Sequence, residues 1–560
     1  MHTLDYKKQL PGITGLLRFT CLISGVFSIL LPGAGHAYDF YVEDRVKEIR
    51  RAIDRPLPSI EEVLGERIEN APAPVLVIGF LDNGDSIDRK DWGKAIGWYL
   101  MESTAGTTDR VAVIPSFQYL SDGITLDTDK KDTRGAYVER VASRTGAKYV
   151  ISGRVGVTEK QIVLELKAKD YETGRQISVI EKEGTTESIG QLIASVANKT
   201  FQALLHYDNP ASANSDFTMA TPVRGEIEAL ATAFAEGEHL APREKADHYE
   251  ALWKKSPIYS TTGTLYLNAL DTLYDDERLD IALAETRAAR HPTPTFLLYS
   301  HVLRSRIAPG GIDNTSVEFL KSRLISNPDN PYAWLALTSA YDNEEATCYT
   351  DKNGALHAKS PAIDHHRGFA SSVSLGLEML KRWPNHYRGW WSLGYSLKAY
   401  AGAVRGPSYW RQVPDQAKVR YKNILAVADS VFVEAMKRHP AQGKMYINLI
   451  GLDVAFGRNW MSTFRRAATL APHNYYTYAV AFNYAQSKWG GTEDYAREIY
   501  KLAKANNPQE NWPQQLRDVW APGIKPIVDL EDTATRIILA AIVLGLILAG
   551  YRFLIKAKNE

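Results

Sequence analysis

Residues 328–341 read Pro-Asp-Asn-Pro-Tyr-Ala-Trp-Leu-Ala-Leu-Thr-Ser-Ala-Tyr, and residues 384–397 vary the same phrase as Pro-Asn-His-Tyr-Arg-Gly-Trp-Trp-Ser-Leu-Gly-Tyr-Ser-Leu. In both segments a tryptophan, Trp334 or Trp390, stands six residues after the proline. Proline ends helices because it lacks the backbone donor and its ring clashes with the preceding turn. We therefore expect one helix to end before each proline and another to begin just after it.

Similar prolines recur along the second half of the chain. They are Pro257, Pro292, Pro328, Pro384, Pro440, Pro472 and Pro508. Most are roughly 35 residues apart, a period typical of stacked helix pairs. Before Pro440 stand Ala428, Phe432 and Ala435, so small residues let two helices approach while an aromatic ring fills the gap between them. This pattern predicts helical repeats over residues 222–520.

The phrases around Trp334, Trp390 and Phe432 resemble the W-x2-L-G-x2-Y and A-x3-F signatures of tetratricopeptide repeats. The resemblance covers roughly half of the chain, and it is weaker at the repeats that end at Pro257 and Pro292. It implies an all-α solenoid of antiparallel helix pairs that binds another protein on its concave face. It names no partner.

Residues 72–206 follow a different pattern. A continuous apolar run at 75–80 and a second one at 110–115 predict buried strands, and residues 162–168 alternate between apolar and charged side chains as in a hairpin. Helical periodicity is found at 91–101, at 137–146 and at 189–205. The order β-α-β-α-β-β-β-α predicts a small α/β (α+β) domain.

Two phrases in this domain carry a second resemblance. Residues 146–155 (Gly-Ala-Lys-Tyr-Val-Ile-Ser-Gly-Arg-Val) and 170–174 (Asp-Tyr-Glu-Thr-Gly) are similar to the amino-terminal domain of TolB. That resemblance implies a domain that docks proteins and has no catalytic centre. The charged residues 38–71 are expected to form a linker helix, and the polar residues 207–221 a linker before the helical array.

The two ends of the chain are apolar. Residues 1–37 have the basic start, short apolar run and small residues of a signal peptide, although an uncleaved anchor is an alternative. Residues 533–555 predict a transmembrane helix, with a buried core helix as the alternative. Acidic residues precede this helix, and the tail at 556–560 carries two lysines, so we expect the tail in the cytoplasm. The sequence therefore predicts a single-pass bacterial inner-membrane protein with its bulk in the periplasm.

Composition and motifs exclude several classes of function. Lysine and arginine number 66 against 65 acidic residues, so no overall field favours nucleic acid. The sequence contains no phosphate-binding G-K-[ST] motif, no G-x-S-x-G and no H-E-x-x-H. We expect no cofactor and no catalytic residues. The insertion at 342–367 is interpreted as a polar loop or a partner-contact surface. A metal site is the weaker interpretation, because the spacings of the possible ligands are irregular: Cys348, Asp351, His357, His365 and His366.

The repeat phase predicts which side chains line the concave groove. Core positions are 4, 7, 8 and 11 of each repeat, so positions 2, 5, 9 and 12 belong to the neighbouring stripe of the helix. The predicted partner-binding residues are Tyr332, Leu335, Ser339, Asp342, Arg388, Trp391, Tyr395, Lys398, Tyr476, Ala479, Asn483 and Gln486. Cations beside aromatic rings suit an acidic peptide or a stacked sugar, although Trp391 could instead pack against an inserted loop.

Three functions remain open at this point. The first is a membrane-anchored scaffold that binds protein partners in the cell envelope. The second is a periplasmic sensor or receptor for a small molecule or glycan, and the third is an enzyme whose residues meet only in the fold. Ala541, Gly545 and Ala549 form a small-xxx-small stripe that could pair two transmembrane helices into a homodimer.

Overall fold

The computed structural model describes most of the chain between residues 47 and 520. The described ranges are 47–53, 57–68, 72–83, 90–105, 110–123, 134–210, 217–237, 240, 242–255, 259–273, 276–286, 292–307, 314–344, 348–350, 356–358, 367–405, 410–440, 442–472, 474–508 and 512–520. The predicted signal peptide (1–37), transmembrane helix (533–555) and tail (556–560) lie outside them. Among these residues, no helix has the length and apolar character needed to span a membrane.

The α/β part contains one mixed sheet, as the sequence predicted. Its strand order is β3-β1-β4-β5-β6, with β2 beside β4. The strands are β1 (Val75–Ile78), β2 (Asp82–Asn83), β3 (Ala112–Val113), β4 (Tyr149–Val157), β5 (Gln161–Asp170) and β6 (Gln176–Thr185). β1 runs parallel to β3 and β4, whereas β4, β5 and β6 form an antiparallel meander.

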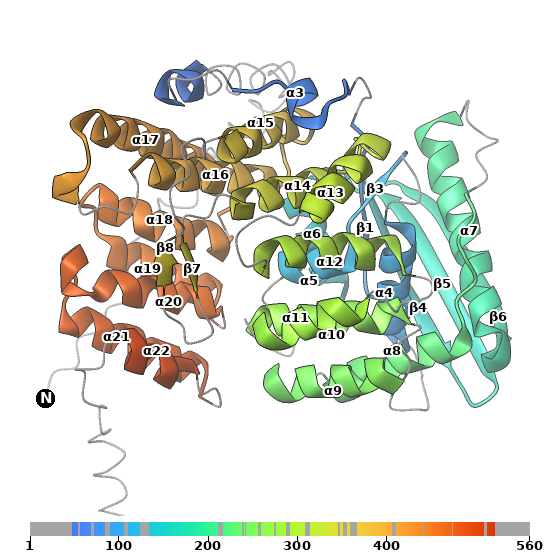
Figure 1. Ribbon diagram of the computed structural model, residues 1–560. Coiled ribbons are helices and arrows are strands. Elements are labelled where there is room, and N and C mark those ends of the chain that lie inside the picture. Colours follow the sequence, from blue (N-terminus) through green and yellow to red (C-terminus); the bar gives the residue numbers. More distant parts are fainter. Residues whose placement is uncertain are drawn as a thin grey trace, which may run out of the picture. The chain divides into compact units, whose positions relative to one another are not determined.

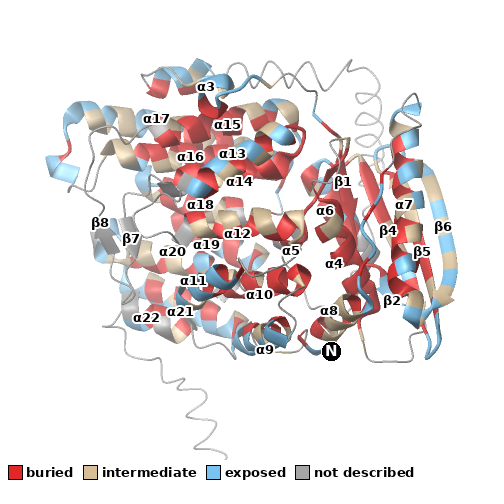
Figure 2. Ribbon diagram, turned by 45° about the vertical axis from the view of Figure 1, so that its right-hand side comes forward, coloured by how far each residue is buried: buried red, intermediate tan, exposed pale blue. Residues whose placement is uncertain are grey.

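Helices cover both sides of this sheet. They are α4 (Trp92–Thr104), α5 (Ser116–Gly123), α6 (Arg134–Thr145) and α7 (Ile189–Asp208). Figure 1 shows α7 on one side of the sheet and α4 on the other. Alternate residues of β5 are fully buried: Ile162, Leu164, Leu166 and Ala168. Figure 2 shows that exposure increases from β4 toward β6, the edge strand of the meander.

Glycine allows α4 to lie directly against the sheet. A Cβ atom on Gly97 would be 2.7 Å from the carbonyl oxygen of Gly79, which is closer than side-chain carbons approach backbone. Gly79 is restricted in turn by Val138 on α6. Because glycine has no Cβ, the helix axis can approach the strand end at this point.

Helices follow one another from residue 224 onward, as expected for helical repeats. They are α8 (Arg224–Gly237), α9 (Pro242–Lys255), α10 (Ser260–Leu273), α11 (Asp276–Glu285), α12 (Pro294–Ile307), α13 (Asn314–Ser326), α14 (Pro331–Glu344), α15 (Arg367–Arg382), α16 (Tyr387–Arg405), α17 (Asp415–Arg438), α18 (Gly443–Ala455), α19 (Trp460–Leu470), α20 (Tyr475–Ala485), α21 (Glu493–Asn506) and α22 (Trp512–Trp520). From α8 to α17 each helix contacts the next one, and α10, α12, α14 and α16 also stack in series. This is the contact pattern of a solenoid.

The six-residue spacing between proline and tryptophan has a direct structural cause. The indole nitrogen of Trp334 donates to the carbonyl oxygen of Pro328 at 2.7 Å, and that of Trp390 donates to Pro384 at 2.9 Å. In a later repeat the Tyr478 hydroxyl donates to Pro472 in the same way, at 2.8 Å. Each aromatic ring therefore satisfies a carbonyl that the preceding helix end leaves without a helical partner.

The glycine of the repeat phrase also has a packing role. A Cβ atom on Gly394 in α16 would lie 2.7–2.9 Å from three ring carbons of Phe432 in α17. Phe432 is itself fully buried. The glycine of the first helix and the aromatic residue of the second thus form one contact between the paired helices.

The α/β part and the helices up to α17 belong to one compact unit, which extends to Met445, and a second unit begins at Tyr446. The expected boundary at 207–221 falls inside the first unit. Within the expected linker, Phe217 stacks on Phe201 of α7 with ring centroids 4.5 Å apart, and the Met219 amide donates to the Asn198 side chain. One continuous hydrophobic core runs from Val63 to Trp383.

The first helices of the repeats face the α/β part. α8, α10 and α12 all contact α4, and α16 contacts α6. The indole of Trp98 in α4 donates to the Thr261 carbonyl in α10 at 3.2 Å. The face that a solenoid usually presents to a partner is therefore covered along α8, α10 and α12 by the protein's own α/β layer.

The residues before the sheet pack on the second helices of the array. A short helix spans 47–53, and α3 (Ile60–Leu64) starts with a capping box at Ser59. Ser374 of α15 donates to the Pro58 carbonyl at 2.7 Å, and Arg420 of α17 donates to the Ile53 carbonyl at 3.0 Å. Part of the predicted linker helix at 38–71 is thus attached to α15 and α17.

The two longer repeats accommodate their extra residues differently. In 342–367 the structure describes a short hairpin, β7 (Cys348–Thr350) paired with β8 (Leu356–Ala358). In 401–418, α16 continues to Arg405 and α17 already starts at Asp415. Much of the second insertion is therefore helix, and it makes α17 the longest helix of the described residues.

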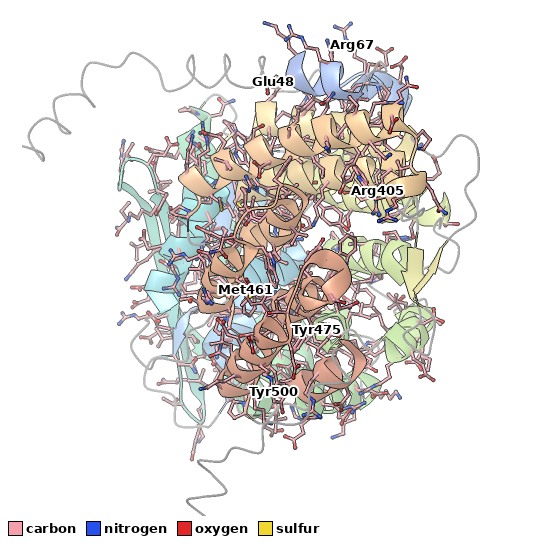
Figure 3. The ribbon with its side chains drawn as sticks, turned by 90° about the vertical axis from the view of Figure 1, so that its left-hand side faces the viewer. Glu48, Arg67, Arg405, Met461, Tyr475 and Tyr500 are labelled. Carbon is pink, nitrogen blue, oxygen red and sulfur yellow. The ribbon has the colours of Figure 1, made fainter. Side chains whose placement is uncertain are left out.

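The second unit has its own hydrophobic core, formed by α19 to α22 and the end of α18. Its fully buried side chains are Ile450, Phe464, Ala467, Tyr478, Ala481, Phe482, Ile499 and Ala503. Figure 3 labels Met461, Tyr475 and Tyr500 on three of these helices. Arg465 of α19 forms a two-pronged ion pair with Glu498 of α21 at 2.6 and 2.9 Å, which links neighbouring repeats across this unit.

Candidate functional site

Four of the predicted groove residues lie on one stripe of α16. They are Arg388, Trp391, Tyr395 and Lys398, and we call this surface the α16 patch. Their spacing of three or four residues places them one above another on the helix surface. Trp391 and Tyr395 stack in parallel, with ring centroids 5.3 Å apart and an interplanar angle of 12°. Tyr395 is 36% exposed, which is unusual for a large aromatic side chain in this protein.

Cations lie at both ends of this aromatic stack. The Arg388 guanidinium is 5.9 Å from the Trp391 ring and 5.2 Å from the ring of Tyr387. Arg388 is only 7% exposed, so its aliphatic part packs while its charge faces rings. Burial lowers the pKa of Lys398 to about 8. A partner carboxylate near Lys398 would reverse this shift, because opposite charges favour the protonated amine.

Two predicted groove residues of α14 connect repeats instead of facing solvent. Tyr332 is 1% exposed and bonds through its hydroxyl to His386 Nε2 at 3.1 Å. Asp342 is 7% exposed and accepts a hydrogen bond from Ser396 of α16 at 2.9 Å. Burial, with Arg388 nearby, lowers the pKa of His386 to about 3, so its neutral ring accepts the Arg388 amide at Nδ1 and donates from Nε2.

The other predicted groove residues differ in exposure. Leu335 is buried, and Ser339 is half-buried on α14. In the second unit, Tyr476 is 44% exposed and packs edge-on against Tyr475 at 6.0 Å. Ala479, Asn483 and Gln486 are half-buried at the same helix and its end. Among these residues Tyr476 has the greatest accessible aromatic surface.

The metal-like cluster of the first insertion is only partly described. His357 lies opposite Tyr349 in the β7–β8 hairpin, and Cys348 lies opposite Ala358. Asp351, His365 and His366 lie outside the described residues. Within the part of the chain that the structure describes, no group of three metal-ligating side chains comes together.

The structure also reveals a buried polar cluster that the sequence analysis missed. Glu102, near the end of α4, is fully buried, and its carboxyl accepts hydrogen bonds from Ser116, from Thr264 of α10 at 3.2 Å and from Thr293 at 2.7 Å. We call these four residues the Glu102 cluster. Burial raises the pKa of Glu102 to about 8, although the three hydroxyl groups favour the ionised form. The carboxyl is therefore mostly neutral at pH 7.

A second, half-buried acid lies beside this cluster. Glu226 of α8 accepts a hydrogen bond from Thr261 of α10 at 2.8 Å, and burial raises its pKa. Charge repulsion from Glu226 also raises the pKa of Glu102, but less than burial does. Through hydroxyl groups of α10, the two acids join α4 and α8 to that helix. The contact between the α/β layer and the array is therefore partly polar, and its hydrogen bonds fix how these helices pack on one another.

A sequence signal for the Glu102 cluster exists, although it is indirect. Glu102 is the only acidic residue between Trp92 and Thr104, a helix that is otherwise apolar or small apart from Lys94 and its hydroxyl residues. Threonines are dense at 261–264 and at 293–295. Only the fold shows that these segments, far apart in the chain, surround one carboxyl group.

Because two comparisons with known proteins found no match, the class of this protein is assigned from its fold and its surface. No protein-family model matches the chain, and no curated protein matches it either. The fold and the α16 patch define a helical-repeat protein with an amino-terminal α/β layer packed on its first repeats.

Proposed function

We propose that this protein is a scaffold of the tetratricopeptide type that binds a protein partner of the cell envelope through the α16 patch. The observation that carries the proposal is the Trp391–Tyr395 stack, in which Tyr395 is exposed and Trp391 half-buried, with the Arg388 guanidinium against the Trp391 ring and Lys398 on the same stripe of the helix. Tryptophan, tyrosine and arginine are the residues that contribute most to protein interfaces. The α/β layer contacts α8, α10 and α12 through α4, and α16 through α6, so binding would use the stripe of α16 on which Trp391 and Tyr395 keep accessible surface.

A partner with acidic side chains suits this surface. Contact with a carboxylate would restore the ordinary pKa of Lys398 and would add a charged hydrogen bond. The rings of Trp391 and Tyr395 would bury apolar parts of the same partner. The TolB-like character proposed for residues 72–206 gives this part of the chain a structural and docking role, consistent with its packing on the array.

If the partner binds at the α16 patch, mutation of the patch should weaken partner binding. Replacing Trp391 and Tyr395 together with alanine should weaken partner binding by about 2 kcal/mol for each ring. The measurement is photo-crosslinking in intact cells, with a photoreactive residue in place of Gly402 of α16 and the yield of the partner adduct as the readout. Gly402 is exposed, and an added Cβ atom there meets no other group. Trp410→Ala is the matched control, since Trp410 is 39% exposed but belongs to a separate cluster with Tyr421. An adduct that persists in the double variant at unchanged yield contradicts the proposal.

We also propose that the chain is anchored in the bacterial inner membrane by residues 533–555, with its bulk in the periplasm. The signal-peptide pattern at 1–37 and the lysines after the apolar stretch support this topology. Alkaline phosphatase inserted at Asn214 should be active, and a fluorescent protein fused after Glu560 should fold in the cytoplasm. Phosphatase that is inactive at Asn214, with a cytoplasmic reporter that works there, rules the topology out.

A further inference from the structure

One face of α17 carries a stripe of exposed side chains. Figure 2 shows exposed residues along this helix. We call the following residues the α17 stripe: Asp415, Val419, Lys422, Ala426, Val433 and Lys437. They follow one another at intervals of three, four or seven residues, and such intervals place side chains on one face of a helix. The opposite face is buried, with Ile424, Ala428 and Ala435, so the α17 stripe is not the surface that holds this helix in the array.

The middle of the α17 stripe is apolar. Val419 is 58% exposed, Val433 is 37% exposed, and the exposed Ala426 lies midway between them. A single exposed valine is common on a protein surface. A spacing of seven residues, however, is the repeat with which two helices pack side by side, and a small residue at the centre lets the two backbones approach. The three residues therefore form a short seam that a second helix fits.

Charges of opposite sign lie at the two ends of this seam. Asp415 lies at the amino-terminal end, where Lys418 is 2.9 Å away. Lys437 lies at the carboxy-terminal end, where Glu434 is 3.4 Å away. Asp415 and Lys437 are equally far from Ala426 along the sequence, and so are Lys418 and Glu434. The charge order of one end is thus the reverse of the other, which makes the helix complementary to a copy of itself that runs in the opposite direction.

A two-fold axis at Ala426 shows what such a copy would contact. Each residue then lies opposite the residue that is equally far beyond Ala426 in the other copy. Asp415 meets Lys437, the two valines of the seam meet each other, and the ion pairs at the ends face each other with opposite charges aligned. Lys422 meets Ser430, which is neutral. A parallel copy would instead place Asp415 against Asp415 and Lys437 against Lys437, so that like charges repel.

We propose that the α17 stripe pairs with the same stripe of a second copy of this chain, running antiparallel, to form a symmetric homodimer. This interface goes beyond the scaffold function, because it uses another helix than the α16 patch and lets one assembly display two such patches. With 24 residues, α17 is about 36 Å long. One pair of such helices lies at the small end of the roughly 1,200–2,000 Å² that stable interfaces bury, so we expect a weak dimer with a Kd on the order of 10 μM.

Sedimentation of the full-length protein in a mild detergent tests the association. The wild type should change from monomer to dimer between about 1 and about 100 μM. Ala426→Glu places two like charges at the two-fold axis and should weaken the dimer about tenfold or more. Ala251→Glu, the same change at an exposed alanine of α9, should leave the dimer unchanged, and circular dichroism confirms that both variants are folded. A wild type that remains monomeric at the highest concentration, or an Ala426→Glu variant that associates like the wild type, overturns the proposal.

Disulfide formation tests the antiparallel register, in a full-length chain whose own Cys21 and Cys348 are replaced by serine. Ala426→Cys should form a linked dimer under mild oxidation, because the two-fold axis brings the two sulfur atoms together. Val419→Cys alone should not, since its two copies would lie about 21 Å apart along the helix pair. A mixture of the Val419→Cys and Val433→Cys chains should form the link again. Position 419 is highly exposed, so random collisions would link it readily, and equal yields from Val419→Cys alone and Ala426→Cys would overturn the proposed pairing.

Discussion

Replacing Trp390 with alanine should lower the free energy of unfolding of the first unit by about 3–5 kcal/mol. The indole is 1% exposed, donates a hydrogen bond to the Pro384 carbonyl and lies beneath the Arg438 guanidinium at 5.2 Å. Alanine would leave a cavity between α16 and α17, a carbonyl without its donor and a cation without its ring. Denaturant unfolding monitored by circular dichroism measures the loss.

The next residue provides the matched control. Trp391 is half-buried on the same helix and contacts mainly Tyr395 and Arg388. Trp391→Ala should therefore cost clearly less than Trp390→Ala, since less of the removed surface is buried. If the two variants lose equal stability, the repeat phase that puts Trp390 in the core and Trp391 on the patch is wrong.

Alkaline pH should destabilise the protein through Glu102. The folded protein raises the pKa of this carboxyl from an ordinary value of 4.5 to about 8, so between these values the folded state holds a proton that the unfolded state has lost. Stability from this group is fully present below pH 4.5, decreases as pH rises and is lost near pH 8. The linkage relation puts the stability lost through Glu102 between these two pH values on the order of 4–5 kcal/mol.

The neutral isostere separates this effect from other titrations. Glu102→Gln keeps the shape of the side chain and cannot ionise, so the melting temperature of the variant should fall less between about pH 5 and about pH 9 than that of the wild type. Glu226→Gln should have a similar but smaller effect, because its pKa is also raised by burial. Parallel melting-temperature curves for wild type and Glu102→Gln would show that Glu102 is already ionised in the folded protein.

The repeat architecture could be predicted because its cause is local. A proline, a tryptophan six residues later and a glycine four residues after that are all within a few helical turns. Their roles, ending a helix, donating to the proline carbonyl and admitting Phe432, depend on short-range geometry. For the same reason the strand alternation at 162–168 identified the buried face of β5.

The exposure of the predicted groove residues could not be predicted in the same way. Periodicity places Tyr332, Asp342 and Arg388 beside the core stripe, but whether such a stripe is open depends on what lies against it. In the structure Tyr332 meets His386 and Asp342 meets Ser396, so both connect successive repeats. Trp391 and Tyr395 keep accessible surface on the same stripe.

Local sequence patterns were enough to predict the helix pairs, the small α/β part and the positions of the residues that join each pair. Two other features depend on tertiary packing: the α/β part covers the first repeats, and Glu102 gathers hydroxyl groups from Ser116, Thr264 and Thr293. The reason is physical. Helix propensity and periodicity are set by neighbours in the chain, whereas burial and pKa depend on groups that the fold brings together from distant positions.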